Sequence, residues 1–385
     1  MLFRCCLIAA LLSATVTCSA QDQAPAAPDR AAAVQLAFTR ARHLQRGINA
    51  SHWFSQSPGD YSAQHTDTET TPDDIATMAR LGFDCVRLSV DPVPLEQLPR
   101  GVDGLNDEFV ARLDHALDTI LADGMAVTID LQPEDSYKQP LRTDNAAVDR
   151  MVALWRKLAA HYASRDPNLV FFEILNEPEV NDPYRWAGIQ ARVAAAIREA
   201  APANTIIATG PNYSDVVDLL ALSPLEDGNV IYNFHFYDPH EFTHQGASWG
   251  VPWWRYEHGI PYPATEDSMP QLVKEIPNRA DRFQLENYWL NHWDADHIRR
   301  LIDQAAGWAQ ANHVPLIANE FGVYRTADPV SRTNWIRDVR TALEADQIGW
   351  AMWDYHNGFG VAVRDQSGKS VVDPQTVAAL GLAGK

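Results

Sequence analysis

The stretch Phe171–Glu179, FFEILNEPE, changes its chemistry halfway along. It begins as an apolar run typical of a buried strand and ends in Asn176, Glu177 and Pro178. Proline has no N–H to donate to a neighbouring strand, so the strand stops where an amide and a carboxylate have just been placed. A strand that only filled a core would have no use for this ending, which therefore indicates a functional site.

The rest of the chain alternates short strand-like segments with amphipathic helical ones. The expected strands are Gly47–Ala50, Cys85–Val90, Met125–Leu131, Leu169–Leu175, Thr205–Thr209, Val230–Phe236, Pro315–Asn319 and Ile348–Trp353. The expected helices are Pro72–Leu81, Asp107–Ala122, Asn145–Ala163, Pro183–Ala200, Ser214–Leu222, Asp294–Asn312, Pro329–Ala345 and Pro374–Leu382. This alternation predicts an α/β fold, a closed (β/α)8 TIM barrel that forms a single catalytic domain over residues 45–385. An open doubly wound sheet is the alternative, but no GxGxxG sequence follows the first strand.

Residues 1–20, MLFRCCLIAALLSATVTCSA, have the layout of a secretory signal peptide, with a basic residue, an apolar stretch and small residues at the end. We expect cleavage after Ala20 and a secreted or periplasmic protein; lipidation at Cys18 is the alternative. Cleavage leaves Cys85 as the only cysteine, so we expect no internal disulfide and a buried, inert thiol. Residues 21–44 are expected to form a tether and a short helix, Ala31–Leu44.

The composition is that of a globular protein, with 46% hydrophobic and 21% charged residues among 385. A formal net charge of −19 argues against nucleic acid and anionic membrane as partners. It favours a neutral or cationic ligand, and a neutral sugar would fit. We also expect a monomer, with no membrane contact once the signal peptide is removed.

In a parallel barrel the side chains at the carboxyl ends of all strands meet at one mouth. The polar or aromatic residues at these ends are Asn49, His52, Arg87, Asp130, Gln132, Asn176, Glu177, His235, Tyr237, Asn319, Glu320, Trp353 and Asp354. Glu177 and Glu320 end the fourth and seventh strands and so face each other across the mouth. Cleavage of a glycosidic bond needs such a pair, because one carboxylic acid protonates the leaving oxygen while the other carboxylate attacks the anomeric carbon or activates water. Arg87 is expected to keep one carboxylate ionised or to form a structural ion pair.

Four motifs in this order resemble family 5 glycoside hydrolases, the cellulase family of the retaining clan A barrels. They are the NEP of ILNEP, the HFY of NFHFYDPH, the NEFG of IANEFG and the final Trp of WAMW, and the resemblance runs from Gly47 to about Val363. It implies that Glu177 is the general acid/base and Glu320 the nucleophile of an anomer-retaining double displacement without a cofactor. It also implies that Arg87, Asn176, His235, Tyr237 and Trp353 surround the sugar. Many relatives end the third strand with His where this chain has Gln132, so the sugar contacts on that side are expected to differ.

The connection after the sixth strand is long and rich in aromatic residues. It carries Trp249, Trp253, Trp254, Tyr256, Tyr262, Tyr288, Trp289 and Trp293. Aromatic rings stack on the apolar faces of sugars, so we expect this loop to wall the cleft, with Trp253 and Trp254 in contact with substrate. The alternative is that these rings only pack the loop onto the barrel.

Other signals are weaker. Residues 246–250, GASWG, match G-x-S-x-G but lack the preceding strand and following helix of a nucleophile elbow. His235, His240 and His244 have no accompanying H-E-x-x-H sequence, so no metal is expected. A carbohydrate-binding scaffold without activity is disfavoured because both glutamates are present. We expect an endo-β-1,4-glucanase, with an exo-acting β-glucosidase or β-glucanase and a β-mannanase as alternatives.

Overall fold

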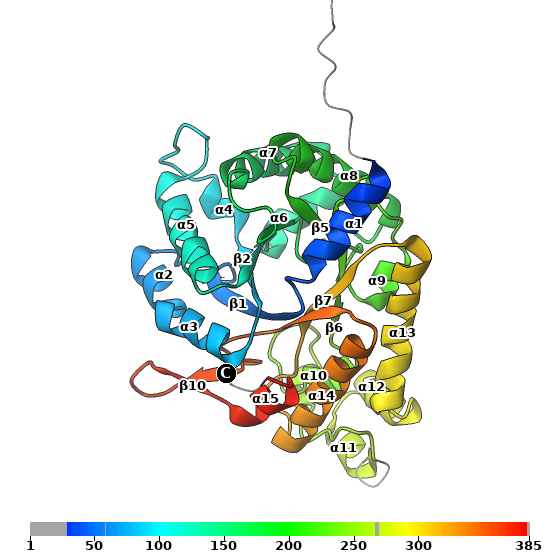
Figure 1. Ribbon diagram of the computed structural model, residues 1–385. Coiled ribbons are helices and arrows are strands. Elements are labelled where there is room, and N and C mark those ends of the chain that lie inside the picture. Colours follow the sequence, from blue (N-terminus) through cyan, green and yellow to red (C-terminus); the bar gives the residue numbers. More distant parts are fainter. Residues whose placement is uncertain (1–28, 58, 266–268, 383–385) are drawn as a thin grey trace, which may run out of the picture.

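The computed structural model describes residues 29–57, 59–265 and 269–382, so the expected signal peptide and most of the tether lie outside the described residues. Eight parallel strands pair in chain order, and the last pairs with the first to close a barrel (Figure 1). They are β1 (Arg46–Phe54), β2 (Cys85–Val90), β3 (Ala126–Leu131), β4 (Val170–Glu173), β5 (Thr205–Thr209), β6 (Val230–Phe236), β7 (Leu316–Phe321) and β8 (Gly349–Met352). The closed (β/α)8 prediction is confirmed and the open sheet was the wrong alternative.

Helices surround the barrel. Those that the sequence predicts are α1 (Arg30–Ala41), α3 (Pro72–Leu81), α5 (Asp107–Ala122), α7 (Asn145–Tyr162), α8 (Pro183–Ala200), α9 (Val216–Leu220), α13 (Ala295–Asn312), α14 (Pro329–Ala345) and α15 (Pro374–Ala379). The structure adds α2 (Ala63–Glu69), α4 (Pro92–Leu95), α6 (Asp135–Lys138), η1 (Gln139–Arg142), α10 (His240–Thr243), η2 (Trp254–Tyr256), α11 (Met269–Glu275), α12 (Arg279–Leu290) and the hairpin strands β9 (Ala362–Arg364) and β10 (Ser370–Val372). These additions are short or lie in long connections, where no sustained periodicity marks an element.

The helix starts follow from their first residues. Asp182 precedes Pro183 at α8, and Asp328 precedes Pro329 at α14; both aspartates accept hydrogen bonds from backbone N–H groups of the first turn. Proline fits there because its missing N–H would have no partner inside the helix. These signals explain why both starts could be predicted to the residue.

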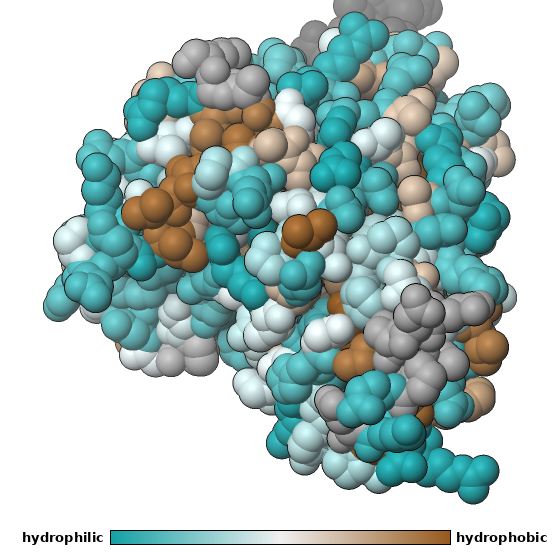
Figure 2. All heavy atoms as spheres, turned by 90° about the horizontal axis from the view of Figure 1, so that it is seen from below, coloured by the Kyte–Doolittle hydropathy of each residue, from teal (hydrophilic) through white to brown (hydrophobic). Residues whose placement is uncertain are grey.

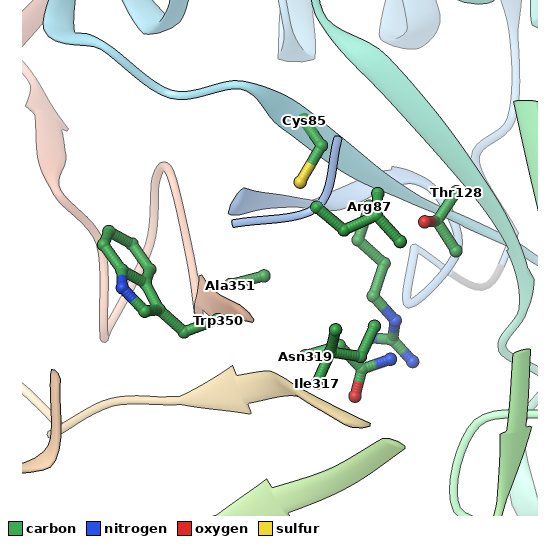
Figure 3. Close-up of a pocket in the computed structure, with 8 residues that line it drawn as sticks. Cys85, Arg87, Thr128, Ile317, Asn319, Trp350 and Ala351 are labelled. Carbon is green, nitrogen blue, oxygen red and sulfur yellow. The ribbon is translucent and has the colours of Figure 1, made fainter. Parts of the chain in front are cut away.

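Helix α1 closes the amino-terminal end of the barrel. Its Ala37 and Ala41 pack with Leu44 against side chains inside the barrel, among them Cys85 and Phe171. A small hollow above this layer is lined by Leu44, Cys85, Arg87, Thr128, Ile317, Asn319, Trp350 and Ala351 (Figure 3). The barrel is therefore apolar at its closed end and becomes polar from Arg87 towards its open end, where the strands stop.

The long connection between β6 and α13 folds over one side of the barrel. Its helices α10, α11 and α12 gather beside α13 and α14 (Figure 1). Tyr262, Tyr288, Trp289 and Trp293 are buried in the main core, so these rings hold the connection in place, as the packing alternative had it.

The described helices include none that is long and apolar enough to cross a membrane. The face shown in Figure 2 is mostly hydrophilic, with apolar side chains gathered in separate places rather than in a belt.

Candidate active site

A bulge in β7 turns two consecutive residues towards the barrel interior. The register with β6 runs from Phe234↔Ala318 to His235↔Glu320 and skips Asn319. Neighbouring residues of a regular strand point to opposite faces, whereas a bulge lets both point to one. The Asn319 amide donates to Glu173 Oε2 (2.8 Å), and Glu320 reaches the centre of the mouth.

Arg87 is the hub of the buried polar network. Its Nε and Nη2 donate to the two carboxylate oxygens of Glu173 (2.8 and 2.7 Å). Its Nη1 donates to Glu320 Oε1 (2.6 Å) and Asn49 Oδ1 (3.1 Å), and its Nη2 also reaches Asn176 Oδ1 (2.9 Å). Only 2% of Arg87 is exposed, so the guanidinium is both ion-pair partner and geometric template for these groups.

Asp130 adds a carboxyl group to this network, 3.0 Å from Arg87 Nη2. Burial raises the pKa of Asp130 well above its usual range, although the positive charge of Arg87 opposes that shift. The two expectations for Arg87 are thus compatible, because it pairs with Glu173 and touches Glu320 at once.

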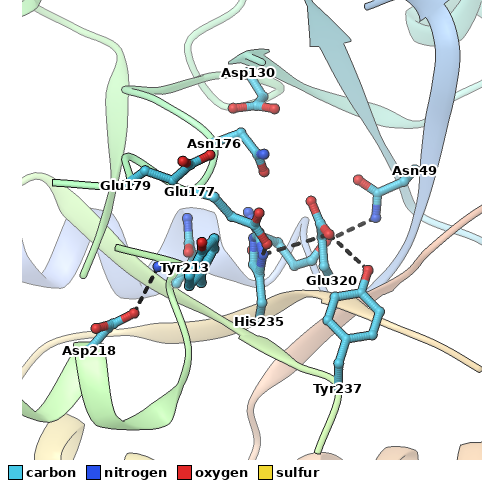
Figure 4. A network of polar contacts seen from close by, with 12 residues as sticks. Asn49, Asp130, Asn176, Glu177, Glu179, Tyr213, Asp218, His235, Tyr237 and Glu320 are labelled. Carbon is cyan, nitrogen blue, oxygen red and sulfur yellow. Dashed lines mark hydrogen bonds and ion pairs between the residues drawn. The ribbon is translucent and has the colours of Figure 1, made fainter. Parts of the chain in front are cut away.

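Both carboxylate oxygens of Glu320 have donors. Arg87 takes Oε1, and the Tyr237 hydroxyl donates to Oε2 (2.8 Å). The side chain of Glu320 is 5% exposed, against 28% for Glu177. Glu320 is therefore held in one orientation by two donors, whereas Glu177, beside His235, is the more exposed of the two glutamates (Figure 4).

Glu177 shares a hydrogen bond with His235, whose Nδ1 lies 2.9 Å from Glu177 Oε1. Burial alone would raise the pKa of Glu177, but the hydrogen bond and charge of His235 hold it below its usual value, with help from Lys138 and Arg87. Burial alone would lower the pKa of His235, but the negative charge of Glu320 and the bond to Glu177 raise it. The contact between the two side chains thus displaces the pKa of Glu177 downward and the pKa of His235 upward.

Ligand atoms of Glu177, His235 and Glu320 lie within 4.8 Å of one another. Such a trio could hold a cation. However, His235, Arg87 and Tyr237 already use three of the four carboxylate oxygens, so the donor set fits hydrogen bonding better, and the absence of a metal stays a prediction.

The remaining strand-end residues differ in how they lie relative to the two glutamates. Trp353 directly follows β8, and its carbonyl packs over Gly322, where a Cβ atom would lie 2.4 Å from that oxygen. Gln132 is buried, and its Oε1 has no hydrogen-bond partner among the described residues. The His52 ring, near the end of β1, instead contacts the carbonyl of Gln56 just after that strand (3.1 Å), so no described hydrogen bond brings it to the glutamates.

One part of the long connection reaches the site through contacts between aromatic rings. His244 lies against Tyr237, with ring centroids 5.2 Å apart, and against Trp254 at 4.5 Å. Trp254 also stacks on His240 with an interplanar angle of 3°. Trp253 and Trp254 are both partly exposed. Their contact with substrate stays a prediction, but Trp254 is only two ring contacts from the nucleophile candidate.

Three residues of the site were missed from the sequence. Glu173 accepts hydrogen bonds from Arg87, Asn319 and Asn233. A signal for it was available, because a carboxylate in a strand buried on both faces needs partners. Tyr213, 55% exposed after β5, lies beside Glu177 and His235 (Figure 4). No local pattern marked Tyr213 or Asn233.

The fold and the site together define a class: a (β/α)8-barrel glycoside hydrolase with two glutamates facing each other at the mouth. The family described as Cellulase (glycosyl hydrolase family 5) matches residues 45–358, and the chain belongs to this family. The resemblance seen in the four motifs is therefore confirmed.

Two relatives and two solved structures show the range of the likeness. Endoglucanase C of Acetivibrio thermocellus is 31% identical over 318 residues, which cover 81% of this chain and 91% of the relative. Cellodextrinase A of Ruminococcus flavefaciens is 33% identical over 327 residues, covering 80% and 84%. A hyperthermophilic endo-β-1,4-glucanase in complex with substrate superposes with a TM-score of 0.72 at 26% identity, over 90% of this chain and 99% of that one. Cel5A of Thermotoga maritima in complex with mannotriose gives 0.71 at 25%, over 89% and 99%.

Proposed function

We propose that the protein is an endo-β-1,4-glucanase that cleaves by double displacement with retention of the anomeric configuration. The observation that carries the mechanism is the close approach of the two glutamates: a carboxylate oxygen of Glu177 lies within 4.8 Å of one of Glu320. Retaining pairs stand about 5–5.5 Å apart, whereas inverting pairs stand about 6.5–9.5 Å apart because a water molecule must fit between carboxylate and sugar.

Glu320 is the nucleophile. Arg87 and Tyr237 donate hydrogen bonds to its two carboxylate oxygens, which hold the carboxylate in one orientation and aim it. In the first step a Glu320 oxygen bonds to the anomeric carbon while the bond to the leaving oxygen breaks. In the second step water attacks the same carbon and Glu320 departs, which restores the configuration.

Glu177 is the acid and then the base. The leaving oxygen takes a proton from Glu177 in the first step, and the attacking water returns one in the second. Substrate that fills the cleft removes water from the exposed side of Glu177, which favours its neutral form, and His235 is the adjacent proton source. Asn176, whose Oδ1 accepts a hydrogen bond from Arg87, would hydrogen-bond a sugar hydroxyl next to the reacting carbon.

The substrate class is supported by the relatives. Endoglucanase C, and the endo-β-1,4-glucanase seen with substrate, support internal cleavage of β-1,4-glucan. Cellodextrinase A, by its name an enzyme of cellodextrins, is the reason to keep the second candidate, an exo-acting β-glucosidase or β-glucanase. Because Thermotoga maritima Cel5A has been seen in complex with mannotriose, β-mannan is included as a test substrate. Gln132, with a buried oxygen free to accept, is the residue through which this chain would read a sugar hydroxyl on the β3 side.

The proposal includes export. Residues 1–20 would direct secretion and be removed, so amino-terminal sequencing of the exported protein should begin at Gln21.

The mode of cleavage is tested by pairing viscometry with a reducing-end assay on a soluble mixed-linkage β-glucan, with carboxymethylcellulose and mannan in parallel. Internal cleavage predicts a rapid fall in viscosity for few reducing ends released. Steady release of glucose or cellobiose at nearly constant viscosity would replace the endo assignment by the exo-acting one. Glu134→Ala serves as control, because this glutamate is exposed beside the same rim and should keep full activity.

A further inference from the structure

Lys138 is an almost fully buried lysine beside the mouth of the barrel. It ends α6, in the connection that follows β3, and is 5% exposed. Its Nζ lies 3.2 Å from Glu179 Oε1. Burying an ammonium group costs free energy unless a partner compensates its charge, so Lys138 depends on Glu179.

Glu179 is tied to the barrel by its backbone as well as its carboxylate. Arg142 Nη2 lies 3.1 Å from Glu179 Oε2, and Arg142 Nε donates to the Glu179 carbonyl oxygen (2.7 Å). The Glu179 N–H donates to the carbonyl of Asn212 (2.8 Å), in the loop after β5. Glu179 thus joins the loops that follow β3, β4 and β5.

The segment between Asn176 and Glu179 carries Glu177 in a strained backbone. Glu177 has φ 37° and Glu179 has φ 54°, both in the left-handed region that residues with a Cβ atom seldom adopt. The segment is fixed at one end by the Asn176 N–H, which donates to the Leu131 carbonyl (2.8 Å), and at the other by Glu179. Such a conformation persists only where surrounding bonds impose it, and Lys138 supplies one of them.

We propose that Lys138 and Glu179 form a positioning pair that holds the loop bearing Glu177 and balances the charge next to its carboxyl group. The pair touches neither Glu320 nor Arg87 by any described bond, and it rests on the proposed acid/base role of Glu177. Lys138 contributes positive charge at Glu177, and Glu179 offsets that charge.

The charged and titratable groups that face Glu177 come from several elements. They are His235 on β6, Glu320 on β7, Arg87 on β2, Lys138 on α6, and Tyr237, Glu179 and Tyr213 on the neighbouring loops. His235 has the larger effect, and Lys138 lowers the pKa of Glu177 in the same direction. Removing Lys138 should therefore raise the pKa of Glu177, whereas removing the charge of Glu179 leaves Lys138 uncompensated and should lower it.

The test uses Lys138→Met, Glu179→Gln and the double variant, each nearly isosteric with the native side chain. The pH dependence of kcat/KM on a cello-oligosaccharide reports the acid in the free enzyme through its alkaline limb. We expect that limb to move by about half a pH unit, upward in Lys138→Met and downward in Glu179→Gln, and to return close to the wild-type position in the double variant. A role confined to folding would lower activity and Tm without moving the limb in opposite directions.

Arg156 and Glu199 provide a matched control, an exposed ion pair with 3.0 Å between Nη2 and Oε2 that joins α7 to α8. Arg156→Met and Glu199→Gln should leave the limb unchanged. Unmoved limbs, or shifts in the same direction, in correctly folded Lys138→Met and Glu179→Gln would overturn the proposal. Its failure is distinguishable from that of the proposed function, because loss of activity in Glu177→Ala does not depend on Lys138.

Discussion

Replacing Arg87 by methionine should lower the free energy of unfolding, and should lower it more at neutral than at acidic pH. The substitution keeps most of the side-chain volume but removes the cation that contacts Glu173, Glu320 and Asp130 at 2.6–3.0 Å. Removing one partner of a buried ion pair costs about 3–5 kcal/mol, because the charge left behind is neither paired nor hydrated. We expect a loss of this size in the free energy of unfolding at pH 7.

The pH dependence follows from linkage. Burial raises the pKa of Asp130 and the charge of Arg87 opposes that rise, so without Arg87 this pKa rises further above its value in the unfolded chain. The folded variant then binds a proton that the unfolded chain has released. A carboxyl group whose pKa is higher in the folded than in the unfolded chain favours folding at low pH, and this contribution is lost as pH rises. The loss amounts to about 1.4 kcal/mol for each pH unit by which the two pKa values differ. The destabilisation of Arg87→Met relative to wild type should thus be smaller by about 1–2 kcal/mol at pH 5 than at pH 7.

Urea denaturation of both proteins at pH 5 and pH 7, followed by tryptophan fluorescence, measures these differences. Arg40→Met is the control, since Arg40 is also buried but hydrogen-bonds to Asn168, Thr205 and a backbone carbonyl instead of carboxylates. It should destabilise the fold by an amount that varies little with pH. An Arg87→Met variant whose loss is below about 1 kcal/mol, or is equal at both pH values, would refute the view that Arg87 compensates buried charge.

Three further outcomes are expected. Tyr237→Phe removes the hydroxyl that donates to Glu320 Oε2, so kcat should fall by about tenfold or more with little change in KM for oligosaccharides; an unchanged kcat would contradict the assigned contact. Trp254→Ala and Trp253→Ala should raise KM or shift product sizes while kcat is largely kept, and unaltered kinetics on polymer and oligomer would assign both rings to packing. Burial raises the pKa of Asp354 to about 7, so its ionisation lowers the free energy of unfolding as pH rises from about 4 through 7. Asp354→Asn should therefore reduce the fall in unfolding free energy between pH 5 and pH 8 by about 1–3 kcal/mol. An equal fall in the variant and the wild type, measured by denaturation at both pH values, would count against this.

The barrel was predictable because its signals are local. Apolar runs such as Val230–Phe236 mark strands buried on both faces, and pairs such as Asp328–Pro329 mark helix starts. The position of Glu177 and Glu320 at strand ends was equally local, because proline follows the first closely and a glycine lies two residues after the second.

What could not be predicted depends on contacts between distant segments. The bulge that turns both Asn319 and Glu320 inward appears only in the register with β6. The bond between Lys138 and Glu179 joins residues 41 positions apart, and nothing near either residue in the sequence announces it. The surroundings of His52 could not be predicted for a similar reason: its φ of 58° and its bond to Gln56 arise from the irregular end of β1.

The central claim is that Glu320 forms a covalent bond with the sugar. Incubation with an activated 2-deoxy-2-fluoro-β-cellobioside should trap that intermediate, since the fluorine slows both steps while the good leaving group keeps formation of the glycosyl-enzyme faster than its hydrolysis. Peptide mass spectrometry should then find one fluorocellobiosyl group, carried by the peptide that contains Glu320, and none in Glu320→Ala. A label on Glu177 or on another residue, or an enzyme that turns over without labelling and releases product of inverted configuration, would contradict the account.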